Sequence, residues 1–315
     1  MALSNYLQMV SWKRPSGSFE AKVFGEVFLA PIMGPADKNG NYTLVMGKDP
    51  KVAYTAHYDT VHKVGGVQRV INKDGIISSE GNDCLGADCT SGIYLILEMI
   101  KTGIEGVYCI FADEEIGCVG STAMAEDLKR SLDTNLYHPL ASCDIMISFD
   151  RMGDNSIITH QSGIRTASDE FAKSLSAELE MGHTADNTGS YTDSNEFAKL
   201  IPECTNLSVG YQGQHTAKED QDFNYLEDLL YSLTFVDVAA LEVSRDPTVE
   251  ERLNYLQGYH MDWERDTELE LVDQMVYENT ELVAHLLIDL GYGSNELIDE
   301  LAIEHPWYSH NYRAI

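Results

Sequence analysis

The stretch Phe111-Ala112-Asp113-Glu114-Glu115-Ile116-Gly117 sets the interpretation of the whole sequence. It follows the apolar run Gly106–Phe111, which is typical of a buried strand, and it precedes a helical pattern from Ala123 to Lys129. Carboxylates at the mouth of a buried strand are costly unless a cation holds them, and a divalent metal ion does this well. One carboxylate would bind the ion, and its neighbour would take a proton from the attacking water. The alternative is a solvated acidic turn.

Composition limits the classes of protein to which the chain can belong. Its 315 residues, 43% of them hydrophobic, are enough for one large domain or two small ones. The formal net charge of -30 argues against nucleic acid or an anionic membrane surface as a partner. The six cysteines form no CxxC pair, which is typical of reduced intracellular thiols. The N-terminus lacks a signal-peptide pattern and no apolar run approaches ~20 residues, so we expect a cytoplasmic protein.

Buried strands and helices alternate along the chain, and several strands end in polar residues. This alternation predicts an α/β fold: a three-layer mixed β-sheet flanked by helices on both faces. Ligands of such sheets bind outside the carboxyl ends of the strands. In residues 1–20 we expect a helix followed by a loop. The expected β-structure comprises Lys22–Ile32 and Tyr42–Met46, joined by a hairpin at Asn39-Gly40, a strand Val52–Asp59, and a hairpin that turns at Lys73–Gly75. The expected later helices are Ile93–Lys101, Ser168–Met181, Asn195–Leu200 and Tyr225–Arg245.

Five residues at or near these strand ends are of metal-binding types, and they supply two imidazoles and three carboxylates: His57, Asp88, Glu115, Asp150 and His215. This mixture suits zinc, and also cobalt or manganese. Two ions roughly 3.5–4 Å apart need one bridging carboxylate and two further ligands each, and the five residues meet that count. Asp88 would bridge the ions. His57 and Asp150 would hold one ion, and Glu115 and His215 would hold the other.

Two further carboxylates have other predicted roles. Asp59 lies two positions after His57, on the same face of a strand, where it can accept the second ring N–H of His57 and fix its tautomer. Glu114 is left without a ligand role. It is placed to take a proton from the attacking water and to pass it to the leaving nitrogen.

The motifs His57-Tyr58-Asp59, Gly86-Ala87-Asp88, Asp113–Gly117, Phe149-Asp150 and Gln214–Thr216 occur in this order. In these motifs, over roughly residues 50–240, the sequence resembles the co-catalytic di-zinc exopeptidase clan. That clan includes bacterial di-zinc aminopeptidases, tetrahedral aminopeptidases, and the tripeptidase and deacylase group. The resemblance implies a phosphorylase/hydrolase-like sheet–helix fold, hydrolysis of an amide near a chain end, the ligand roles given above, and Glu114 as general base. A cis peptide after Asp88 is a feature of some relatives.

The spacing of the motifs sorts the chain within the clan. Asp150 and His215 are 65 positions apart, too close for the lid domain that the tripeptidase and deacylase group inserts there. The 31 positions between His57 and Asp88 leave no room for the insertion that is usual in the tetrahedral group. We therefore expect a lid-less, aminopeptidase-like domain, although Tyr58–Val61 looks more like the deacylase group.

A boundary is predicted at Asp246-Pro247. Residues 1–246 would form the di-metal catalytic domain, and residues 247–315 a C-terminal helical extension with apolar residues at helical spacing from Leu269 onward. In one interpretation this extension packs on the core. In the other it forms a contact in a homo-oligomer.

Several other residues have two interpretations each. Asp193, in Thr192-Asp193-Ser194, either binds a free α-amine of the substrate or caps a helix. Tyr211 either polarises the substrate carbonyl or is a buried strand residue. Arg151 either pairs with a carboxylate or is structural. We expect the remaining histidines of interest to be surface or loop residues: His62, His160 and His183.

Together the residues predict a metal-dependent hydrolase of peptide or related amide bonds, in the first place an aminopeptidase. Its substrate would be a peptide or an acyl-amino acid, and its cofactors two divalent metal ions, in the first place zinc. A deacylase or carboxypeptidase on the same metal site is the alternative enzyme. A non-catalytic binding or assembly protein that retains a peptidase fold is the alternative outside enzymes.

Overall fold

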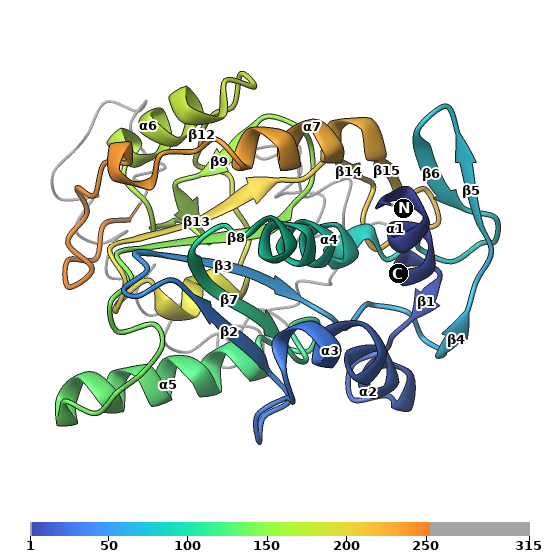
Figure 1. The fold of residues 1–315 in the computed structure, drawn as a ribbon. Coiled ribbons are helices and arrows are strands. Elements are labelled where there is room, and N and C mark those ends of the chain that lie inside the picture. The colour runs from blue at the N-terminus through green and yellow to red at the C-terminus, as the bar shows by residue number, and fades with distance from the viewer. Residues whose placement is uncertain (1, 253–315) are drawn as a thin grey trace, which may run out of the picture. The chain divides into compact units, whose positions relative to one another are not determined.

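The computed structural model describes residues 2–252. Seven strands form the central mixed sheet, in the order β12-β9-β13-β8-β3-β7-β2 (Figure 1). They are β2 (Tyr42–Met46), β3 (Val52–His57), β7 (Gly106–Phe111), β8 (Ile145–Arg151), β9 (Ser156–Ile158), β12 (Thr184–Asp186) and β13 (Glu203–Ser208). Strands β13, β8, β3 and β7 run parallel, so their carboxyl ends meet at one edge of the sheet.

Helices cover both faces of this sheet, and the predicted three-layer α/β fold is confirmed. The helices are α1 (Ala2–Val10), α2 (Phe19–Phe24), α3 (Ala30–Met33), α4 (Ala87–Thr102), α5 (Val119–Thr134), α6 (Asp169–Leu179) and α7 (Phe223–Leu233), with a π-helical turn η1 (Gly25–Leu29) and 3-10 turns η2 (Asp193–Phe197) and η3 (Val238–Ala240). Side chains of β7 alternate between two cores. Tyr108 and Ile110 join the core that contains α4, and Cys109 and Phe111 join the one that contains α5.

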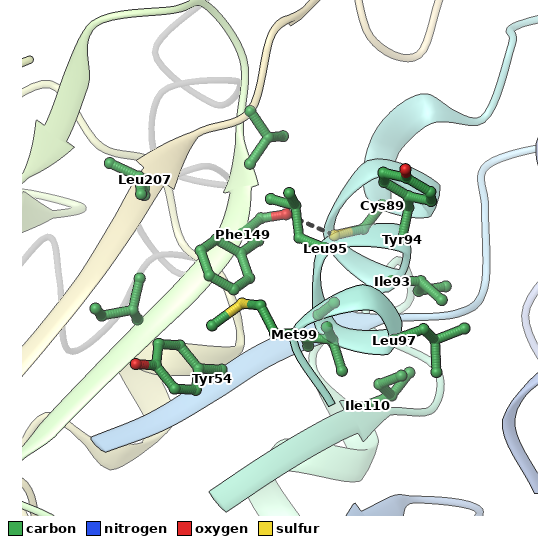
Figure 2. Close-up of a cluster of buried hydrophobic side chains, with 14 of the residues drawn as sticks. Tyr54, Cys89, Ile93, Tyr94, Leu95, Leu97, Met99, Ile110, Phe149 and Leu207 are labelled. Atoms are coloured by element: carbon green, nitrogen blue, oxygen red, sulfur yellow. Dashed lines mark hydrogen bonds between the residues drawn. The ribbon is translucent and has the colours of Figure 1, made fainter. Parts of the chain in front are cut away.

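Helix α4 lies directly on the sheet, as Figure 2 shows. Met99 lies beside Phe149 of β8 and Tyr54 of β3, and the thiol of Cys89 donates a hydrogen bond to the carbonyl oxygen of Phe149. Gly92 allows this approach, because a Cβ atom there would collide with the same carbonyl oxygen. The close packing fixes the start of α4 against the end of β8, where Asp150 lies.

The remaining strands form three smaller sheets. Two of them have two strands each: β1 (Trp12–Lys13) pairs with β4 (Gly66–Val67), and β10 (His160–Gln161) pairs with β11 (Ile164–Arg165). The third has the order β14-β15-β6-β5 and consists of β5 (Val70–Lys73), β6 (Ile76–Ser79), β14 (Tyr211–Gln212) and β15 (Asp220–Asp222). The hairpin predicted at Lys73–Gly75 is confirmed by the pairing of β5 with β6. Between β8 and His215, the chain adds β9 and β12 to the edge of the central sheet.

The prediction of β-structure in Lys22–Ile32 is wrong, because α2, η1 and α3 form a helical segment there. Ser18 begins it by accepting a hydrogen bond from the backbone N–H of Ala21. The rings of Phe24 and Phe28 pack together, with their centroids 4.8 Å apart. The intrinsic β preference of Val and Phe is thus overridden by aromatic packing on one side of a helix.

Two predicted helices also differ from the structure. The helix predicted over Tyr225–Arg245 is the shorter α7, which ends at Leu233. It is followed by a separate turn, η3, in which the side chain of Asp237 accepts a hydrogen bond from the backbone N–H of Ala239. The helix predicted at Asn195–Leu200 is the 3-10 turn η2.

The predicted C-terminal helical extension falls almost entirely outside the described residues. Residues 247–252, the part of it that is described, belong to the same compact unit as the residues before them. The N–H of Arg165 in β11 donates to the carbonyl oxygen of Glu251, and the two side chains form an ion pair of 3.0 Å. No helix in residues 2–252 is long and apolar enough to cross a membrane.

A buried arginine connects the N-terminal segment to the edge of the sheet that carries the polar residues. The guanidinium of Arg14 donates to the carbonyl oxygens of Tyr58 (2.7 Å) and Met9 (3.1 Å) and to the hydroxyl of Thr90 (2.7 Å). It also lies over the ring of Phe24, 4.2 Å from the centroid. These contacts join α1, the end of β3 and the start of α4, so Arg14 holds three elements in place at once.

Replacement of Arg14 by Met is expected to lower the free energy of unfolding by roughly 3 kcal/mol or more, because several buried oxygen acceptors lose their donor. Urea denaturation followed by circular dichroism measures this. The control is Arg69→Met, which removes an exposed arginine paired with Glu80 at 3.7 Å and is expected to change the free energy by less than about 0.5 kcal/mol. Equal unfolding midpoints for the two variants would contradict the role of Arg14.

Candidate metal centre

The five predicted ligands come from five segments of the chain that converge at the carboxyl edge of the sheet. His57 is the last residue of β3 and is paired in register with Phe111, the last residue of β7. Asp150 lies near the end of β8 and Glu115 in the turn after β7. His215 lies in the loop between β14 and β15.

Asp88 lies at the start of α4, and the peptide bond between Asp88 and Cys89 is cis, as in some members of the clan.

The two imidazoles approach different oxygens of one carboxylate. Nε2 of His57 lies 3.0 Å from Oδ1 of Asp88, and Nε2 of His215 lies 3.0 Å from Oδ2 of Asp88. Each imidazole also approaches one further carboxylate: His57 Nε2 lies 3.4 Å from Oδ1 of Asp150, and His215 Nε2 lies 3.3 Å from Oε2 of Glu115. The five side chains therefore form two pairs that share Asp88.

This geometry fits divalent metal ions. Nitrogen and oxygen ligands bound tetrahedrally to zinc at ~2.0–2.1 Å are separated by about 3.3 Å, close to the separations found here. Oε1 of Glu115 is buried and has no hydrogen-bond partner among the described residues, which is costly for a carboxylate unless a cation contacts it. Ligand atoms of His57, Asp88 and Glu115 lie within 4.8 Å of one another, as do those of His57, Cys89 and Asp150.

Asp59 connects the metal ligands of two strands. Its two carboxylate oxygens accept the backbone N–H groups of Glu114 (3.0 Å) and Glu115 (3.1 Å). Nδ1 of His57 lies 3.2 Å from the carbonyl oxygen and 3.4 Å from Oδ1 of Asp59. Because both neighbours are acceptors, Nδ1 carries the proton and Nε2 is free to bind an ion. Asp59 thus orients His57 and also positions the turn that carries Glu115.

The carboxylates around the two imidazoles make the site favour positive charge. Burial alone would lower the pKa of His57, but Asp150, Asp59 and Asp88 raise it well above its ordinary value. Hydrogen bonds with Asp88 and Glu115 raise the pKa of His215 to about 11. Burial favours the neutral form of Asp88, yet the two imidazoles outweigh it and lower its pKa. Metal ions would take the place of these imidazole protons.

Glu114 faces the same cluster. Its Oε2 lies 4.0 Å from Nε2 of His57, and its Oε1 accepts a weak hydrogen bond of 3.5 Å from the thiol of Cys118. Burial raises the pKa of Glu114 to about 9, and a neighbouring divalent cation would act in the opposite direction by favouring the carboxylate. One oxygen is thus occupied by Cys118, and the other is directed toward the metal ligands.

Asp150 is held from the side of η2 and β14. Thr192 donates its hydroxyl to Oδ2 of Asp150 at 2.7 Å, and Tyr211 donates its hydroxyl to Oδ1 at 3.3 Å. Tyr211 is buried in β14, and its hydrogen bond helps to fix the carboxylate of Asp150. Asp193 is only 1% exposed and does not cap a helix, and its Oδ1 has no hydrogen-bond partner among the described residues. Burial raises its pKa to about 8.

The three histidines expected at the surface or in loops are all buried. His62 and His183 lie in loops, whereas His160 lies in β10, which corrects the prediction for His160. Each is hydrogen-bonded away from the metal ligands: His62 to Thr60 and to the carbonyl oxygen of Cys84, His160 to Thr159, and His183 to Tyr225. Arg151 pairs with a carboxylate, that of Asp186, at 3.3 Å. All six cysteines are buried and unpaired.

The N-terminal segment contributes to the site in a way that the sequence does not indicate. Ser16 donates its hydroxyl to Oδ2 of Asp59 at 2.6 Å, and the N–H of Gly17 donates to Oδ1 of Asp113 at 2.8 Å. These contacts span 43 and 96 positions of the chain, and no local pattern marks them. A loop far from the motifs in sequence therefore helps to hold the carboxylates.

The family model of peptidase family M28 matches residues 41–199, half of the chain. This chain belongs to peptidase family M28. The matched region contains Glu114 and four of the five predicted ligands, and His215 lies beyond it. The family is typically metal-dependent, which agrees with the ligand groups described above. No curated protein matches the sequence significantly.

Solved structures share the fold at low sequence identity. Aminopeptidase PepT from Bacillus cereus is 16% identical, with 75% of this chain and 96% of that chain covered and a TM-score of 0.58. A tripeptidase from Staphylococcus aureus is also 16% identical, with 76% and 98% covered and a TM-score of 0.57. The TET1 peptidase from Pyrococcus horikoshii is 14% identical, with 77% and 100% covered and a TM-score of 0.57.

Asp59→Asn tests the link between the two strands. The amide keeps one acceptor oxygen but turns an NH₂ group toward the other backbone N–H, so zinc affinity is expected to fall about 10- to 100-fold in a chelator competition titration. Asp222→Asn is the matched control, because Asp222 accepts both of its backbone N–H groups on the single atom Oδ1, which asparagine also provides. Unchanged affinity in Asp59→Asn would show that Asp59 does not orient the ligands.

Proposed function

We propose that the protein is an aminopeptidase that uses two divalent metal ions, in the first place zinc. His57 and Asp150 would hold one ion, Glu115 and His215 the other, and Asp88 would bridge them. The observation that carries the proposal is the position of Asp88, whose two oxygens each lie 3.0 Å from a different imidazole. Family membership supports the coarser statement that the chain is a metal-dependent peptidase.

The ions, when bound, would polarise the scissile carbonyl and make a water easier to deprotonate. The residues of the chain provide the remaining steps. Glu114 accepts the proton of the attacking water on Oε2, the oxygen that faces the ligands, and then donates it to the leaving nitrogen. The thiol of Cys118 donates a hydrogen bond to Oε1 of Glu114, and Asp59 accepts one from its backbone N–H. These contacts leave Oε2 as the oxygen that accepts the proton. The imidazole of His57 is kept in one tautomer by Asp59.

A free amino terminus is the feature of the substrate that best fits this site. Seven carboxylates lie at or beside it, against two imidazoles: Asp59, Asp88, Asp113, Glu114, Glu115, Asp150 and Asp193. Two divalent ions leave a negative balance that attracts an ammonium group and disfavours a terminal carboxylate. Aminopeptidase and tripeptidase are also the activities named for the similar structures from B. cereus and S. aureus. We propose a homo-oligomer as well, since the TET1 peptidase can assemble into a tetrahedron or an octahedral shell.

Glu114→Ala is expected to lower kcat by about 100- to 10,000-fold on a leucine anilide while zinc remains bound, because the base is lost and the ligands are intact. Anilide cleavage measures kcat, and elemental analysis measures bound zinc. Glu126→Ala, which removes an exposed glutamate of α5, is expected to match wild type in both. Wild-type kcat in a zinc-loaded Glu114→Ala variant would exclude Glu114 as the base.

A panel of matched substrates distinguishes the aminopeptidase from the other enzyme hypotheses. We expect cleavage of a peptide with a free amino terminus and an amidated carboxyl terminus, and no cleavage of its N-acetylated form, because the acetyl group removes the ammonium charge. The rate of product release by chromatography measures both. A deacylase would instead release acetate from N-acetyl-leucine, and a carboxypeptidase would require the free carboxyl terminus.

A further inference from the structure

Glu219 is a buried carboxylate that the proposed mechanism does not use. Only 2% of it is exposed. Its Oε2 accepts the backbone N–H of Gly86 at 2.9 Å, and its Oε1 accepts the backbone N–H of Asp88 at 3.0 Å. Both N–H groups belong to the start of α4, at its N-cap Gly86 and at Asp88, the proposed bridging carboxylate. Glu219 therefore fixes the backbone at Asp88 from a position 131 residues later in the chain.

The loop that ends at Glu219 also carries His215. We define the His215 loop as residues 213–219. In this loop Glu219 is buried, whereas residues 215–218 are exposed, and His215 itself is 49% exposed at its side chain. The loop touches Asp88 at both of its ends, through the imidazole of His215 on the carboxylate and through Glu219 on the backbone N–H. An exposed ligand thus depends on a buried residue four positions away.

Hydrogen bonds within the loop join its two ends. The hydroxyl of Thr216 donates to the carbonyl oxygen of Gly213 at 2.7 Å, and the N–H of Lys218 donates to the Thr216 hydroxyl at 3.1 Å. The N–H of Glu219 donates to the carbonyl oxygen of Thr216 at 3.1 Å. The turn is therefore internally braced, and a shift of Glu219 moves the residues that follow His215.

We propose that Glu219 is a positioning residue for the metal pair formed by Glu115 and His215. By binding the backbone at Asp88 and ending the His215 loop, it sets the distance between the bridging carboxylate and the exposed imidazole. The proposal rests on the proposed function only in that divalent ions bind at these residues. It assigns Glu219 no contact with the substrate or with the ions.

A purely structural role is the alternative, and the chain offers a matched case of it. Glu203, also fully buried, accepts the backbone N–H groups of Ser168, Ser244 and Arg245 and the hydroxyl of Ser168. It is the first residue of β13, at the edge of the sheet opposite to the metal ligands, because β13 is parallel to β8. Loss of Glu203 should destabilise the fold without affecting the site.

The test compares Glu219→Gln with Glu203→Gln in the full chain. In Glu219→Gln the side-chain NH₂ group faces a backbone N–H, and we expect the affinity for the more weakly bound zinc ion to fall about 10- to 100-fold. Glu203→Gln is expected to lower the melting temperature and to bind both ions as wild type does. Zinc affinity and stoichiometry are measured by calorimetry and elemental analysis, and folding by circular dichroism.

A cycle with His215→Ala separates positioning from general destabilisation. If Glu219 acts through His215, adding Glu219→Gln to His215→Ala causes no further loss of zinc affinity. An additive further loss would overturn the proposal, and so would wild-type affinity for both ions in a folded Glu219→Gln variant. If that variant does not fold, Glu219→Asp, whose shorter side chain reaches fewer of the N–H groups, provides the same comparison.

The outcomes for the two proposals are distinct. Wild-type protein that binds zinc but cleaves no peptide would refute the proposed aminopeptidase and leave the role of Glu219 to be decided by the zinc affinities. Wild-type protein that binds no divalent ion would refute both.

Discussion

The two imidazoles contact different oxygens of Asp88, and the other carboxylates of the site are arranged around this contact. Burial of Asp88 beside Glu115 and Asp150 concentrates negative charge in a place where water cannot screen it. The adjacent carboxylates raise the pKa of both imidazoles and so favour their positively charged forms. A site with this charge balance is arranged for cations, and the backbone N–H groups that bind Asp59 and Glu219 hold its geometry.

The fold class and the convergence of the ligands could be predicted from sequence because both follow from strong local patterns. Apolar runs such as Gly106–Phe111 are too short for helices, and each is followed by polar residues at the edge where parallel strands end. Once His57 and Phe111 end adjacent parallel strands, the residues after them must be close in space. The proposed metal-ligand assignment rests on residue types, on the order of the motifs and on the resemblance to the exopeptidase clan, all of which can be read from the sequence.

The elements that were mispredicted depend on contacts that the local sequence does not contain. Residues 19–33 are helical because Phe24, Phe28 and Trp12 pack against one another and Gly25 lies against the ring of Tyr42. Ser16 and Glu219 act through hydrogen bonds that span 43 to 133 positions, and Arg14 reaches Tyr58 and Thr90 over 44 and 76 positions. No periodicity or turn signal marks such a partner, so these residues could be found only from the structure.

The two halves of the metal centre differ in how they are held. His57 is 1% exposed and lies on β3, and Asp150 lies on β8 between the hydroxyl groups of Thr192 and Tyr211. His215, by contrast, is half exposed, and its backbone lies in the left-handed region with φ of 63°. Solvent therefore reaches the site from the side of His215. The half with His57 and Asp150 keeps the position of Asp88 through buried contacts, whereas the half with His215 is open to solvent.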